Sequence, residues 1–122
     1  MQPDAFIAFY PCHDLAASRD FYARDLGLAL ERDQGSCLIF RAGVGYLGFC
    51  QHEGALPHHP GLILTLVLDD VDGAYARLRT LGVETEGPPR HNERFGVHHF
   101  FARDPDGYRL ELQRFVTPLG QG

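Results

Sequence analysis

Short apolar segments separated by turn residues run along the whole chain, and their spacing predicts strands with two helices between them. Residues 6–10 are apolar and aromatic, which is typical of a buried strand, and Pro11 would end it. After Asp14, a good helix N-cap, apolar side chains recur at helical spacing as far as Gly27, which suits the left-handed turn after a helix. The other apolar segments of the first half predict three short strands, at residues 28–31, 37–41 and 46–50.

The same order of elements recurs in the second half of the chain. Residues 62–68 predict a strand, and a helix is expected between Asp70 and Gly82. Three more strands are expected, at residues 83–86, 97–103 and 108–115. Such a repeat predicts an α+β fold in which the sheets of two βαβββ modules form one curved mixed sheet, with a concave pocket inside and the helices outside. We expect a single domain, 1–122, with modules at about 5–51 and 62–116 and a linker at 52–61.

Composition and charge narrow the classes of partner. The chain has 122 residues, a formal net charge of -5 and no run of lysine or arginine, which disfavours nucleic-acid binding. Its longest apolar runs are too short to span a bilayer, so no membrane association is expected. The first residues lack the basic start and apolar centre of a signal peptide, and we therefore expect a cytoplasmic protein.

The three cysteines are Cys12, Cys37 and Cys50. Their number is odd, no two have the spacing of a redox or metal motif, and each lies in or beside an apolar segment. We therefore expect all three to be small buried hydrophobic residues.

Several motifs together resemble a known family. They are Asp14-Leu15, Phe21-Tyr22 and Leu26-Gly27-Leu28, then Leu68-Asp69-Asp70-Val71, Leu78 and Leu81-Gly82-Val83, and finally the segment from Phe101 to Leu112. In this order they resemble the vicinal-oxygen-chelate superfamily, which includes glyoxalase I, extradiol dioxygenases, fosfomycin-resistance thiol transferases and bleomycin-resistance proteins. The resemblance covers nearly the whole chain and implies the fold above, while one fold hosts many functions.

The resemblance also implies where a metal would lie. In the enzymes of this superfamily a divalent metal is held by residues from the first and last strands of each module. Counting from the motifs, the two first-strand positions fall on Ile7 and Ile63, which cannot bind metal, and a last-strand position falls on Glu111. The matching residues 48–51 offer no carboxylate. One ligand cannot hold a catalytic metal, so we expect no cofactor at the standard site.

Glu111 and the histidines leave two alternatives open. Glu111 is either a pocket acid that pairs with a cationic ligand or a structural acid held by a neighbouring arginine. Strand alternation places His99 rather than His98 on the face of Glu111. A nonstandard divalent-metal site made of His59, His99 and Glu111 is therefore the alternative to a metal-free pocket.

Aromatic residues from several strands suggest what the pocket holds. We expect Phe9, Tyr46 and Phe101 to face it, where they would stack on a planar or cationic guest. Arg94-Phe95-Gly96 also resembles the entry to the penultimate strand of bleomycin-resistance-like members, and the loop 87–94 is expected to border the pocket. The predicted ligand-binding residues are thus Phe9, Tyr46, Phe95, His99, Phe101 and Glu111. By the same resemblance we expect a homodimer.

Three functions are compatible with these features. The first is a metal-free protein that binds and sequesters a small molecule, as in antibiotic resistance of the bleomycin type. The second is a metal-dependent lyase, dioxygenase or thiol transferase with a displaced metal site. The third is an interaction module whose pocket is filled by its own side chains. We favour the first, and so expect binding without catalysis, because Ile7 and Ile63 occupy the metal positions while the aromatic residues remain.

Overall fold

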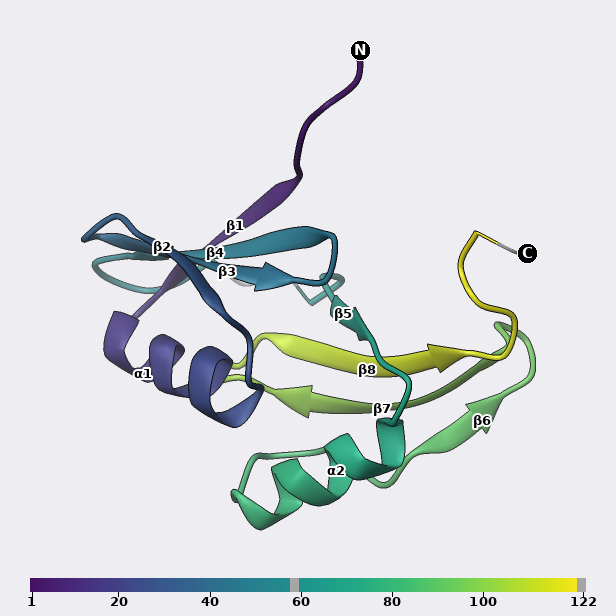
Figure 1. The fold of residues 1–122 in the computed structure, drawn as a ribbon. Coiled ribbons are helices and arrows are strands. Elements are labelled where there is room, and N and C mark those ends of the chain that lie inside the picture. The colour runs from purple at the N-terminus through teal and green to yellow at the C-terminus, as the bar shows by residue number, and fades with distance from the viewer. Residues whose placement is uncertain (58–59, 121–122) are drawn as a thin grey trace. The chain divides into compact units, whose positions relative to one another are not determined.

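A computed structural model describes residues 1–57 and 60–120 of the chain. The chain divides into two compact units, Met1–His59 and Pro60–Gly122. Each unit contains one four-stranded mixed sheet and one helical segment (Figure 1). The predicted α+β fold with two βαβββ modules is therefore confirmed.

The first unit has the strand order β1-β4-β3-β2, with β1 parallel to β4 and the other pairs antiparallel. Its elements are β1 (Ile7–Cys12), α1 (Leu15–Arg19), a π-helical continuation η1 (Asp20–Asp25), β2 (Leu30–Asp33), β3 (Cys37–Ala42) and β4 (Gly45–Gln51). Asp14 caps α1 by accepting a hydrogen bond from Ala16 N at 2.9 Å. Gly27 follows the helical segment with a φ of 75°, as its position in the sequence predicts.

The core of the first unit is aromatic. Tyr22 stacks on Phe49 with ring centroids 4.3 Å apart, and Phe40 joins them, all three fully buried. The strand expected at residues 6–10 is not buried: Phe6, just before β1, is 72% exposed, and Phe9 within β1 is 51% exposed. As an edge strand, β1 also continues through Pro11, whose missing N–H is tolerated where only one side of the strand is paired.

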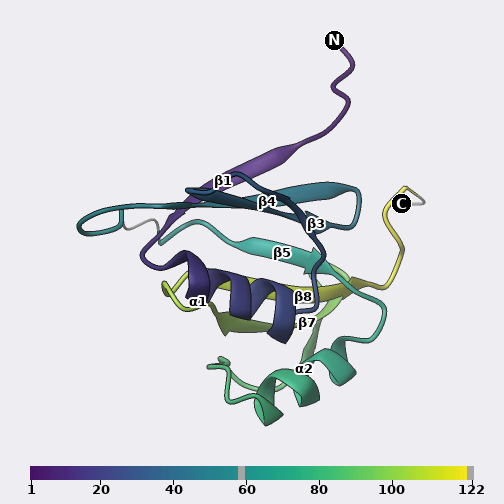
Figure 2. The same ribbon diagram turned by 60° about the vertical axis from the view of Figure 1, so that its left-hand side comes forward.

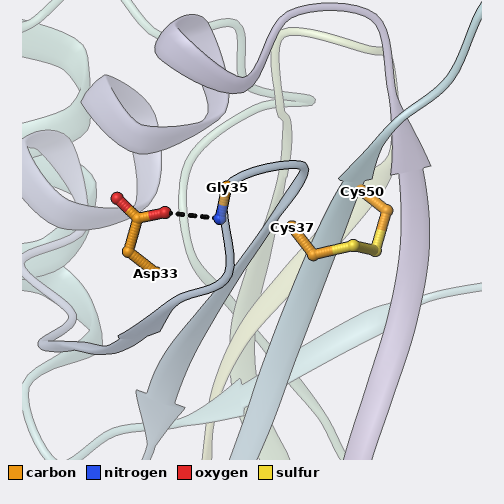
Figure 3. Close-up of a disulfide and its surroundings, with 4 residues drawn as sticks. All are labelled: Asp33, Gly35, Cys37 and Cys50. Carbon is orange, nitrogen blue, oxygen red and sulfur yellow. Dashed lines mark hydrogen bonds between the residues drawn. A yellow bond between two sulfur atoms is a disulfide. The ribbon is translucent and has the colours of Figure 1, made fainter.

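A disulfide between Cys37 and Cys50 corrects the prediction that all three cysteines are isolated apolar residues (Figure 3). The two residues lie directly opposite each other on the antiparallel strands β3 and β4. Just before β3, Asp33 accepts a hydrogen bond from Gly35 N at 2.9 Å and closes the turn that leads into Cys37. Cys12, by contrast, is fully buried and takes no part in the disulfide. The sequence alone does not predict this disulfide, because only the register of β3 and β4 brings the two cysteines together.

The second unit repeats this arrangement with the strand order β5-β8-β7-β6. Its elements are β5 (Leu64–Val67), α2 (Val71–Thr80), β6 (Arg90–Asn92), β7 (Val97–Arg103) and β8 (Arg109–Phe115). Asp70 caps α2 through Gly73 N at 2.8 Å, and α2 lies along one face of the sheet, as Figure 1 and Figure 2 both show. No helix within residues 1–57 and 60–120 is long and apolar enough to cross a membrane.

The region between α2 and β7 differs from the prediction. Residues 83–86 form no strand, although Thr85 makes an isolated bridge to Ala102. The fourth strand is instead β6, which lies inside the segment that was expected to be a loop. Its residues are all polar and therefore show none of the apolar alternation by which a strand is recognised.

Candidate functional site

The two faces of β7 and β8 serve different purposes. Phe100, Ala102, Leu110 and Leu112 are buried on the face toward α2, where Phe100 meets Tyr75 edge-on with ring centroids 5.3 Å apart. The alternate residues point to the opposite face, because side chains alternate along a strand. There, cross-strand pairs such as Phe101 with Glu111 and His99 with Gln113 lie next to one another.

This opposite face carries a cavity of about 480 Å³, a size suited to a small organic molecule. Ten residues, all in the second unit, line it: Ile63, Arg90, Asn92, Phe95, Val97, His99, Phe101, Glu111, Gln113 and Phe115. Half of them are apolar, three being phenylalanines, and the other half are polar. The wall therefore offers both stacking surface and a few hydrogen-bonding groups.

A hydrogen-bonded pair lies on the polar side of the cavity. His99 Nδ1 is 2.6 Å from Glu111 Oε2, and Thr65 Oγ1 donates to Glu111 Oε1 at 3.0 Å. Both side chains are nearly buried, with 8% of His99 and 14% of Glu111 exposed. Glu111 is thus a structurally held acid, but its hydrogen-bond partners are His99 and Thr65, and the neighbouring Arg109 contributes only electrostatic attraction. Because both carboxylate oxygens are engaged, Glu111 is also poorly placed to receive a cationic guest.

Phe101 contacts two neighbouring side chains in the cavity wall. Its ring meets that of His99 edge-on, with centroids 5.1 Å apart, and the guanidinium carbon of Arg109 lies 3.7 Å from its centroid. Phe95 is 64% exposed, and Asn92 Oδ1 accepts a hydrogen bond from its backbone N at 3.3 Å. Of the three phenylalanines that line the cavity, Phe101 is therefore held by its neighbours and Phe95 is accessible to solvent.

The arginine behind Phe101 is held by Glu86. Arg109 Nε and Nη2 each donate to this carboxylate at 3.0 Å, and Arg103 lies 3.3 Å from it. The hydrogen bond from Arg109 is the main cause that lowers the pKa of Glu86 below its ordinary value, and the same contact raises the pKa of Arg109. The two hydrogen bonds from Arg109 to Glu86 hold the guanidinium over the Phe101 ring.

We expect the contribution of Glu86 to stability to depend on pH. Because the pKa of Glu86 is lower in the folded state, its contribution is fully present above the unfolded pKa of about 4.3 and is lost as pH falls through the folded value. Glu86→Gln should therefore lower the free energy of unfolding at pH 7, by up to about 1 kcal/mol for a partly exposed pair, and by much less at pH 3. Urea unfolding at both pH values measures the difference.

Glu84→Gln is the matched control, since Glu84 is exposed and makes no ion pair with any residue that the structure describes. Its effect should be small and equal at both pH values. A Glu86→Gln effect that does not change with pH would contradict the assignment.

The structure brings together four of the six predicted ligand-binding residues: Phe95, His99, Phe101 and Glu111. The other two, Phe9 and Tyr46, belong to the first unit and do not line this cavity. The Phe9 ring covers Gly48, and the Tyr46 hydroxyl accepts a hydrogen bond from Arg41 at 3.0 Å. Both side chains lie on one face of the first unit's sheet, because Ile7 pairs with Tyr46 and Phe9 with Gly48.

Sequence reasoning missed several lining residues. Gln113 and Phe115 share the strand face of Glu111 and could have been found by counting two and four positions along β8. Arg90 and Asn92 could not have been found in this way. They lie opposite His99 and Val97 on strand β6, which has no apolar pattern.

The donors present do not fit the metal that the superfamily's enzymes hold. Ile63 brings only hydrocarbon to the cavity, while His99 and Glu111 are hydrogen-bonded to each other. No group of three or more His, Cys, Asp or Glu side chains in residues 1–57 and 60–120 has the arrangement of a metal site. His59, the third member of the alternative site, lies outside the described residues. We therefore derive no step through a metal.

Comparisons with known proteins agree with this architecture. A model of the Glyoxalase/Bleomycin resistance protein/Dioxygenase superfamily matches residues 5–112. A glyoxalase/bleomycin resistance protein/dioxygenase from Nocardioides is 23% identical with a TM-score of 0.74, and the match covers 100% of this chain and 89% of that one. A glyoxalase-related enzyme from Fulvimarina pelagi is 21% identical with a TM-score of 0.78, covering 100% and 96%.

A third solved structure, TioX from Micromonospora sp. ML1, is 17% identical with a TM-score of 0.78, and the match covers 92% of this chain and 98% of that one. A search of curated proteins finds no match. Structural likeness at these identities supports the fold, and the family model covers most of the sequence. The chain belongs to the Glyoxalase/Bleomycin resistance protein/Dioxygenase superfamily.

Proposed function

We propose that the protein binds a planar organic molecule in the cavity of its second unit, without a metal and without transforming it. The observation that carries the proposal is the lining itself: three phenylalanines and two aliphatic residues face five polar groups around about 480 Å³. Aromatic walls favour flat guests through stacking, and a few polar groups suffice to orient them. The family description names bleomycin-resistance proteins, and the resemblance to them favours binding over catalysis.

Two further expectations belong to the same proposal. We propose a homodimer, because a second copy would cover the exposed apolar residues of edge strand β1, including Ile7 and Phe9. We also propose a cytoplasmic location, which would require the Cys37–Cys50 pair to be reduced there, since cytosolic thiols are kept reduced.

Thermal unfolding in the presence of planar compounds tests the binding proposal. A compound at a hundred times its Kd should raise the free energy of unfolding by about 2.7 kcal/mol, which corresponds to a rise of several degrees in Tm. Phe101→Ala removes one of the three lining phenylalanine rings and should abolish most of the rise. The compound should be recovered unchanged after incubation with the protein.

Divalent metals and EDTA complete the same experiment. A rise in Tm with Zn²⁺, Ni²⁺, Mn²⁺ or Fe²⁺ that EDTA reverses and Glu111→Ala abolishes would replace the proposal with the metal-dependent alternative. If no compound and no metal changes Tm, the proposal is wrong and the cavity has no small-molecule role.

A further inference from the structure

A row of three polar side chains crosses the sheet of the second unit in the cavity wall. Arg90 on β6 lies opposite His99 on β7, and His99 lies opposite Gln113 on β8, so the three share one face. All three line the cavity. The next row on one side contains Phe115, and the next row on the other side contains Phe101. The polar row thus lies between two rows that each carry an aromatic ring.

Donor groups of this wall are available to a guest. The guanidinium of Arg90 carries five N–H donors, and it forms no hydrogen bond or ion pair within the described part of the chain. The side-chain amide of Gln113 likewise forms no hydrogen bond with any residue that the structure describes. Asn92 accepts a hydrogen bond from Phe95 N with its Oδ1, while its Nδ2 has no partner among the described residues. A guest therefore meets one charged donor and two neutral amides.

The acidic side chains near this row are already bound. Both oxygens of Glu111 accept hydrogen bonds from neighbouring side chains, and Glu86 accepts two from Arg109. Glu86 attracts the Arg90 guanidinium electrostatically but forms its ion pairs with other arginines. Arg90 is therefore a positive charge in the cavity wall with no contacting carboxylate among the described residues. A carboxylate that enters with a guest would complete this pair.

We propose that the guest of this cavity is a planar aromatic carboxylate, whose carboxylate binds the guanidinium of Arg90 while its ring lies against the phenylalanine side chains. This inference rests on the proposed binding function and adds the chemical class of the ligand. The guanidinium is planar and always charged, and it can bind both oxygens of a carboxylate through two parallel N–H bonds. The aromatic rows on either side of Arg90 and Gln113 supply the stacking surface. A cationic guest would instead meet the charge of Arg90 and a carboxylate, Glu111, whose oxygens are already bound.

Three matched probes test this inference: 2-naphthoate, 2-naphthamide and 2-naphthamidine. They share one flat ring system and a planar head group of similar size, and at pH 7 they are negative, neutral and positive. By isothermal titration calorimetry we expect 2-naphthoate to bind about tenfold more tightly than 2-naphthamide, the effect of one hydrogen-bonded charge pair. We expect 2-naphthamidine to bind most weakly. Raising the ionic strength should weaken only the binding of 2-naphthoate, because Arg90 is exposed to solvent on the edge strand.

Arg90→Gln is the test variant, because glutamine keeps a polar side chain and removes the charge. The protein should still fold, since Arg90 is exposed on the edge strand β6. The variant should bind 2-naphthoate and 2-naphthamide equally, whereas Arg90→Lys should keep a preference for 2-naphthoate. Arg114→Gln is the matched control, because it removes the same charge from the opposite face of the same sheet, outside the cavity. It should leave the preference unchanged.

The outcomes separate this inference from the binding proposal. Equal affinities of the three probes in the unmodified protein, or tightest binding of 2-naphthamidine, would overturn the inference and leave planar binding intact. An effect of Arg114→Gln as large as that of Arg90→Gln would also overturn it, because the overall charge would then explain the preference. So would failure of all three probes while another planar compound binds. Failure of every planar compound would overturn both proposals.

Discussion

Replacing Phe100 with alanine should lower the free energy of unfolding by about 3–5 kcal/mol, the usual cost of removing a buried aromatic side chain. Phe100 is 2% exposed and packs on Tyr75 of α2, so its loss opens a cavity between the helix and the sheet. Urea unfolding followed by circular dichroism measures the change. The loss should be independent of any ligand, because Phe100 does not line the binding cavity.

The adjacent Phe101 is the matched control. It lies on the other face of β7 and is only partly buried, so Phe101→Ala should cost less than about 2 kcal/mol. The same variant should lose the rise in Tm with planar compounds, which Phe100→Ala should retain at temperatures where it is folded. Equal destabilisation by the two variants would contradict the assignment of the two faces.

Reducing the Cys37–Cys50 disulfide should lower the free energy of unfolding by about 2–3 kcal/mol. The bond closes a loop with a sequence separation of 13, and a cross-link of this length restricts the unfolded chain by about that amount. Urea unfolding with and without dithiothreitol measures the effect. The double variant Cys37→Ala/Cys50→Ala should be equally destabilised and insensitive to the reductant.

Cys12→Ala separates the disulfide from the remaining thiol. Because Cys12 is not part of the disulfide, this variant should lose the same 2–3 kcal/mol on reduction as the unmodified protein. If the unmodified protein is indifferent to dithiothreitol, or if the double variant still responds to it, the disulfide has no part in stability.

Local signals in the sequence were sufficient for most of the fold. The capping aspartates Asp14 and Asp70 and the terminating glycines Gly27 and Gly82 act within a few residues of themselves, so they could be read without knowledge of the tertiary structure. Strand β6 could not be predicted from local signals, because it pairs through its backbone and consists of polar residues. The exposure of β1 likewise depends on its place at the edge of the sheet rather than on its composition.

The residues of the candidate site were predictable in part, and their contacts were not. Alternation along β7 and β8 was enough to expect His99, Phe101 and Glu111 on one face. The contact between His99 and Glu111, like the disulfide, depends on the register of neighbouring strands, which a single sequence does not reveal. The sequence therefore indicated which residues line the cavity, but it did not indicate their hydrogen-bond partners.

The alternation of β7 and β8 has a consequence for how this family diversifies. Residues that hold the sheet to α2 and residues that line the cavity occupy alternate positions on the same strands. Mutations at the cavity positions can therefore accumulate and change the ligand while the packing against the helix is inherited intact. This separation is one physical reason why a single architecture can host many functions.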